Sequence, residues 1–161
     1  MRWQRFLVPL DLSPDADDAL EYAMGLAAVL QAHVTLLHVL ELPKRVDMSL
    51  TPARIAMETT SKRELEARLQ RVHQAGVAGE MMRVHGVPFQ EIIAIAQAIG
   101  ADLIIMSTHG RTGLRHALLG SVAEKVVRLA PCAVLVTRPS DAIPTPEGEA
   151  GEARGTVSAP D

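Results

Sequence analysis

Five short apolar runs alternate with helix-like segments along the chain, and this alternation restricts the fold more than composition does. The runs are rich in Val, Ile and Leu, as buried strands are. Between them, apolar residues recur every three or four positions, as on one face of a helix. We expect strands at residues 6–10, 33–40, 80–85, 102–106 and 133–137. Strands that alternate with helices form an open, doubly wound parallel sheet with helices on both faces, which is the α/β class.

Two strand orders suit such a sheet, 3-2-1-4-5 and 2-1-3-4-5, and the pattern alone leaves both open. In the first order the winding reverses between the first and fourth strands. Ligands bind beyond the carboxyl ends of the strands at such a reversal. The two loops there would be residues 11–13 and 107–120, the most polar turns of the chain. Ser13 and Pro14 suit a helix start directly after the first of these loops.

Charge and cysteine content exclude several classes of protein. The net charge of −3 argues against a nucleic acid partner. Cys132 is the single cysteine, so no disulfide forms within the chain. No run of about 18 apolar residues occurs, and the sequence starts without the apolar stretch of a signal peptide, so we expect a cytoplasmic protein that does not enter membranes. Residues 1–138 are expected to form one domain, and the Pro- and Gly-rich residues 139–161 a disordered tail.

Residues 107–121 leave an apolar strand, enter a helix, and have the composition of a phosphate-binding loop. Gly110 and Gly113 allow the backbone to approach a ligand closely because they have no Cβ. Gly120 and Ser121 stand at a helix start, where amide groups and the helix dipole favour anions. A plain surface loop with a Gly-Ser helix cap explains these residues equally well. The stretch is neither a Walker A loop nor the GxGxxG fingerprint.

Motifs spread over residues 4–138 resemble the universal stress protein family. They occur in the family's order, and in one-letter code they are FLVPLDLS at 6–13, LLHV at 36–39, GVP at 86–88, ADLIIM at 101–106, HGRTG at 109–113, LGSVAEKV at 119–126 and APCAVLV at 130–136. Of the two strand orders we expect 3-2-1-4-5, as in adenine nucleotide alpha hydrolase-like folds. The resemblance also implies a role in stress resistance, an adenine nucleotide as ligand, and a homodimer through the last strand, Ala133–Thr137.

The family's ATP-binding branch carries Gly, two residues, Gly, nine residues, then Gly and Ser or Thr. Gly110, Gly120 and Ser121 fit this pattern, whereas Ser107 stands at the position of the first glycine. The resemblance therefore implies ATP, ADP or AMP as cofactor, with Mg²⁺ reaching Asp11 through the nucleotide. It assigns to the adenosine pocket Pro9, Asp11 and Val39, and to the phosphates Gly110, Arg111, Gly113, Gly120, Ser121 and Val122. The predicted site also includes Leu10, Met106, Ser107 and His109.

Several polar residues have simpler explanations. Asp11 would serve as a turn former by bonding backbone amides, although the resemblance favours a ribose or metal role. We expect His38 to be a packed strand histidine, and His109 lacks the neighbouring ligands that a metal site needs. Cys132 has no cationic neighbour in the sequence to activate it, so an inert thiol is expected. The charged stretch 62–68 reads as a solvated helix face.

Three functions stay open. The first is a nucleotide-binding regulator with an unidentified protein partner, in which ATP orders loop 107–120. The second is a dimeric interaction module of the same family that binds no nucleotide, which Ser107 favours. The third is a slow ATPase in which Asp11 or His109 assists the attack of water. No catalytic residue is assigned and at most weak hydrolysis is expected, because the sequence offers no convincing general base.

Overall fold

Five parallel strands form one sheet in the order β3-β2-β1-β4-β5, which confirms the predicted order. The computed structural model describes residues 3–41, 52–108 and 120–138. The strands are β1 (Arg5–Pro9), β2 (His33–Leu40), β3 (Gly79–His85), β4 (Leu103–Ser107) and β5 (Ala133–Thr137). β1 lies at the centre and pairs with β2 on one side and with β4 on the other. The winding therefore reverses between β1 and β4.

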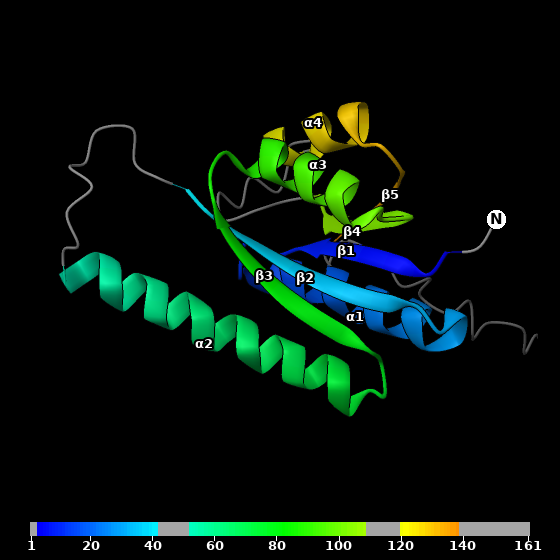
Figure 1. Cartoon of the computed structure of the whole chain (residues 1–161), viewed down its shortest axis with the longest axis horizontal. Helices are drawn as coiled ribbons and strands as arrows, with labels where there is room; N and C mark the ends of the chain where they lie inside the picture. Colours follow the sequence, from blue (N-terminus) through cyan, green and yellow to red (C-terminus); the bar gives the residue numbers. More distant parts are fainter. Residues whose placement is uncertain (1–2, 42–51, 109–119, 139–161) are drawn as a thin grey trace, which may run out of the picture.

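Among the residues that the structure describes, four helices cover the sheet in two layers, as the α/β pattern predicts (Figure 1). α1 (Pro14–Leu30) and α2 (Pro52–Gln74) lie on one face, and α3 (Pro88–Ile99) and α4 (Ser121–Leu129) on the other. In the described residues, no helix combines the length and the apolar character required to cross a membrane. The tail predicted for residues 139–161 lies outside the described residues.

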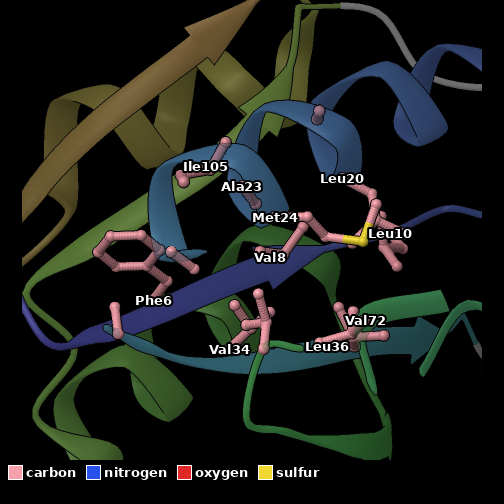
Figure 2. Close-up of a cluster of buried hydrophobic side chains, with 14 of the residues drawn as sticks. Phe6, Val8, Leu10, Leu20, Ala23, Met24, Val34, Leu36, Val72 and Ile105 are labelled. Carbon is pink, nitrogen blue, oxygen red and sulfur yellow. The ribbon is translucent and has the colours of Figure 1, made fainter. Parts of the chain in front are cut away.

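Two apolar clusters hold the layers together, one on each face of the sheet. Phe6 and Val8 of β1 turn toward α1 and pack in the first cluster, together with Val34 and Leu36 of β2 (Figure 2). Leu7, between them in sequence, packs in the second cluster under α3 and α4. Successive strand side chains point to opposite faces, so a strand buried on both faces must be apolar throughout. Each large side chain buried in this way contributes about 2 kcal/mol.

The helix ends follow local signals in the sequence. The Ser13 hydroxyl caps α1 by accepting a hydrogen bond from the amide of Ala16 at 3.3 Å, and Pro14 takes the first helical position. Gly100 ends α3 with φ 59°, in the left-handed region where glycine is favoured. α1 instead ends at Gln31, which holds φ 54° without being glycine.

At the amino edge of the sheet, by which we mean the end where its strands begin, hydrogen bonds connect the start of β1 to its neighbours. One Asp102 carboxylate oxygen, Oδ2, accepts from the amides of Gln4 and Arg5, each at 2.9 Å. The Asp102 amide donates to the Arg5 carbonyl at 2.9 Å, and the His33 amide to the Gln4 carbonyl at 2.7 Å. The bond from Gln4 is the largest cause that lowers the pKa of Asp102 below its ordinary value. These contacts tie the starts of three neighbouring strands together.

Candidate functional site

A cavity of about 690 Å³ opens at the carboxyl edge of the sheet, the end where its strands finish. The ends of β1, β2 and β4, the start of α4 and one side of α2 form its walls. It lies where the winding reverses, which is where open α/β sheets bind their ligands. A volume of this size suits a small organic ligand such as a nucleotide.

Every predicted site residue that the structure describes lines this cavity. From the strand ends these are Pro9, Leu10, Asp11, Val39, Met106 and Ser107, and from the start of α4 they are Gly120, Ser121 and Val122. They come from four separate stretches of the chain. They meet because the carboxyl ends of parallel strands share one edge of the sheet. His109, Gly110, Arg111 and Gly113 lie outside the described residues.

The turn between β1 and α1 has a fixed conformation. Leu10 donates its amide to the Leu37 carbonyl at 2.8 Å, which continues the pairing with β2 beyond the end of β1. Asp11 Oδ1 accepts hydrogen bonds from the Ser13 amide at 3.0 Å and the Ser13 hydroxyl at 2.5 Å. Leu12 holds φ 65°, a left-handed conformation that costs a residue other than glycine about 1 kcal/mol or more. The turn therefore presents Asp11 to the cavity in a defined place.

The end of β4 and the start of α4 form the opposite wall. Ser107 is 8% exposed and Thr108 is 7% exposed. The Gly120 amide donates to the Thr108 carbonyl at 2.8 Å, so the helix start is bonded to the strand end across the intervening loop. Gly120 is the N-cap of α4 and offers no side chain to the first-turn amides. A helix start with such amides and a positive dipole end attracts anions.

α2 supplies a wall that sequence reasoning missed. Met57, Thr60, Ser61 and Glu64 line the cavity from one side of this helix. Their spacing of three and four residues places them on one helix face. This spacing could be read from the sequence, but nothing in the sequence indicates that this helix face lies beside the cavity.

The expectation that residues 62–68 form only a solvated face is wrong for Arg68. Its side chain is 12% exposed. Arg68 Nε donates to one Asp17 oxygen at 2.7 Å and Nη2 to the other at 3.1 Å, and Nη2 also donates to the Leu12 carbonyl at 3.4 Å. This guanidinium therefore links α2 to α1 and to the turn after β1, because its planar fork matches a carboxylate.

His38 and Cys132 are both packed into the fold, and the described residues hold no metal site. His38 is 5% exposed on β2, and its Nδ1 lies 2.8 Å from the Leu10 carbonyl oxygen. Burial raises the pKa of the half-buried Cys132 thiol, which keeps it protonated near neutral pH. In the described part of the chain, no group of three or more His, Cys, Asp or Glu residues could hold a metal ion.

Comparisons with known proteins agree with this architecture. The sequence profile of the Universal stress protein family matches residues 2–138. A universal stress protein from Methanocaldococcus jannaschii is 34% identical over 143 residues, which span 84% of this chain and 82% of that protein. The solved structure of the universal stress protein UspA from Lactobacillus plantarum superposes with a TM-score of 0.77 at 28% identity, over 86% of this chain and 99% of that one.

A third protein shares the fold and was solved with a nucleotide. It is the universal stress protein from Archaeoglobus fulgidus in complex with dAMP. The TM-score is 0.64 at 22% identity, over 84% of this chain and 98% of that one.

Proposed function

This chain belongs to the universal stress protein family, and we propose that it binds an adenine nucleotide, ATP or one of its products, at the carboxyl edge of its sheet. One observation carries the proposal. A single cavity of about 690 Å³ is lined by residues from all the described stretches that the family pattern assigns to nucleotide binding. A protein of the same fold was solved with dAMP, which is an adenine nucleotide.

The two walls of the cavity would contact different parts of the nucleotide. Asp11 would accept hydrogen bonds from the ribose hydroxyls, because its carboxylate is held in the turn after β1. The backbone of Val39 at the end of β2 would lie beside the adenine ring. Phosphates would meet the first-turn amides of α4 at Ser121 and Val122, next to the N-cap Gly120, where the helix dipole favours negative charge.

Mg²⁺ would enter with the nucleotide and not as a resident metal. The described residues contain no metal-ligand cluster, but Asp11 places one carboxylate in the cavity. Mg²⁺ is commonly held by one or two carboxylates together with substrate phosphates. The donor set fits this arrangement, and a bound Mg²⁺ would neutralise part of the phosphate charge.

The biological role that we propose is regulatory. Occupancy of the cavity would report the nucleotide state to a protein partner during stress. The alternative of a slow ATPase would need Asp11 or His109 to assist the attack of water. His109 lies outside the described residues, and the Asp11 carboxylate already accepts two hydrogen bonds from Ser13. Phosphate release above background that falls on Asp11→Ala would favour the ATPase.

Calorimetric titration with ATP and with AMP tests the proposal directly. We expect binding by the native protein and a loss of about tenfold in affinity on Asp11→Ala, from the removal of charge-assisted hydrogen bonds. Asp15→Ala is the matched control, because Asp15 lies in the first turn of α1 and does not line the cavity. Absence of heat and of thermal stabilisation at millimolar nucleotide would exclude the proposal.

Ser107 favours a second candidate, a family member that works without nucleotide. Its side chain stands where the ATP-binding branch has glycine, and it lines the cavity while 8% exposed. Ser107→Gly restores the family pattern and separates the two candidates. ATP binding by the native protein that strengthens in Ser107→Gly supports the nucleotide-binding role, whereas a native protein that fails to bind, with or without binding by Ser107→Gly, supports the interaction module.

We also propose that β5 joins two copies of the chain. β5 is the outer strand next to β4, and in the described residues no other strand pairs with its far side. An uncovered strand edge invites pairing with a second chain. Leu135 on this strand is 38% exposed. Light scattering should report a dimer at micromolar concentration and a monomer after Leu135→Glu, and a monomeric native protein would contradict the proposal.

A further inference from the structure

His38 is the buried polar residue that joins β2 to the wall of the cavity. It is 5% exposed and belongs to the cavity lining. Its neighbours in β2, Leu36 and Leu37, are fully buried apolar side chains that need no polar partner. A buried imidazole is costly unless it is hydrogen-bonded, so its place among these residues calls for a specific contact.

That contact is made with the backbone of the turn after β1. His38 Nδ1 lies 2.8 Å from the Leu10 carbonyl oxygen, in a buried contact between residues 28 apart in sequence. A carbonyl oxygen only accepts hydrogen bonds, so Nδ1 carries the proton in this contact and donates it. The bond fixes both the tautomer and the orientation of the ring.

β2 thereby binds both backbone polar groups of Leu10. Its amide donates to the Leu37 carbonyl at 2.8 Å, and its carbonyl accepts from His38. The next residue is Asp11, and the one after it is Leu12 with φ 65°. Because a strained backbone conformation persists only where its surroundings hold it, the two hydrogen bonds of Leu10 help to keep this turn in place.

We propose that His38 is a positioning residue for the nucleotide site, which orients Asp11 through the Leu10 carbonyl without touching the ligand's reacting groups. The inference rests on the proposed nucleotide binding for its effect on affinity. Its effect on the turn holds in the protein without nucleotide. Arg68, which bonds the Leu12 carbonyl from α2, supports the same turn from the other side.

Three substitutions at one position separate positioning from mere burial of a polar group. His38→Asn places an amide N–H where Nδ1 stands, and His38→Gln places it where Nε2 stands. His38→Leu removes the donor and fills its place with an apolar side chain. Positioning through Nδ1 predicts rescue by Asn and not by Gln, whereas a general need for a polar side chain predicts equal rescue by both. Thr35→Val is the matched control, because Thr35 is a buried hydroxyl on the same strand that bonds Glu80 away from the cavity.

The first measurement is amide hydrogen exchange by NMR without nucleotide. We expect His38→Leu to speed exchange at the Leu10 and Ser13 amides about tenfold, as the loss of one buried hydrogen bond predicts. His38→Asn should stay within about threefold of the native rate, and Thr35→Val should leave both amides unchanged. Unchanged exchange at both amides in His38→Leu overturns the inference, whatever the nucleotide result.

The second measurement is ATP affinity in a double-mutant cycle with Asp11→Ala. We expect His38→Leu to weaken ATP binding about tenfold in the native background and less than about twofold when Asp11 is already Ala, because both act through one contact. Full additivity overturns positioning through Asp11. If the native protein binds neither ATP nor AMP, the proposed function fails, and the exchange measurement alone decides the role of His38 in the turn.

Discussion

The same strands end very differently at the two edges of the sheet. At the amino edge, Asp102 bonds the starts of β1 and β4 together, and short backbone bonds close the connections. At the carboxyl edge, the ends of β1, β2 and β4 border a cavity of about 690 Å³ that is also lined by Asp11, Ser107 and the start of α4. We therefore expect the amino edge to contribute mainly to stability and the carboxyl edge to serve the proposed binding of a nucleotide. Substitutions at the amino edge should therefore change the free energy of unfolding and leave ATP affinity unchanged. Substitutions at the carboxyl edge should change ATP affinity.

Gly120→Asp should have the largest effect, and it acts on binding. Aspartate is a favourable N-cap, so α4 should gain about 0.5–1 kcal/mol in stability. Its charge would face the phosphates, and we expect ATP affinity to fall by at least about 100-fold, measured by calorimetry. Gly120→Asn caps the helix equally well without the charge and should lose far less affinity. Similar affinities for the two variants would argue that no phosphate lies at the start of α4.

Gly79→Ala should have the next largest effect, and it acts on stability. An added Cβ would lie 2.9 Å from the Val34 carbonyl oxygen and 3.0 Å from a Val72 methyl group, so the start of β3 must shift. We expect the free energy of unfolding to fall by about 2 kcal/mol in urea titrations, with ATP affinity unchanged. Gly25→Ala is the control, because nothing lies within 4 Å of its added Cβ and a helix gains about 1 kcal/mol from alanine. A loss of affinity in Gly79→Ala would show that the two edges are coupled.

Asp102→Asn should cost about 1 kcal/mol, because the carboxylate is largely solvated although it accepts two backbone hydrogen bonds. The folded state lowers the pKa of Asp102, so its contribution is present above the unfolded-state pKa and is lost as pH falls through the folded-state value. The variant should therefore lose less stability than the native protein when the pH drops below about 4. Glu66→Gln, an exposed acid on α2, should reproduce neither effect. Equal acid sensitivity of native protein and Asp102→Asn would contradict this account.

The smallest effects should come from Gln31 and Leu12, which in the described part of the chain are the left-handed residues other than glycine, one at each edge. Gln31→Gly at the end of α1 relieves φ 54° and should raise stability by about 0.5–1 kcal/mol without changing ATP affinity. Leu12→Gly relieves φ 65° but frees the turn that carries Asp11, so ATP affinity should fall a few-fold. Thermal unfolding and calorimetry on both variants make the test. If Gln31→Gly and Leu12→Gly change ATP affinity by the same factor, the two edges do not differ in their effect on binding.

The sequence pattern predicted the strands and the shared edge at which the site residues meet, whereas the order of the strands was chosen by the family resemblance. Asp11, Val39, Ser107 and Gly120 could be grouped because each follows or ends a strand-like run or begins a helix, and parallel strands end together. α2 could not be placed on the cavity, because Thr60 and Glu64 have the same spacing that a solvated helix face has. The contact of Arg68 with Asp17 and the bond from His38 to Leu10 depend on tertiary packing across many residues, which local patterns do not encode.

The central place of β1 also sets an order on folding. β1, β2 and β3 are complete once residue 85 has been made, but β1 gains its second neighbour only with β4 at residues 103–107. Pairing across so long a stretch of chain is slow compared with local pairing. A chain still on the ribosome at that stage leaves one side of its central strand, β1, unpaired. The cavity proposed to bind a nucleotide, which needs both neighbours of β1 and the start of α4, is therefore among the last parts of the molecule to be assembled during synthesis.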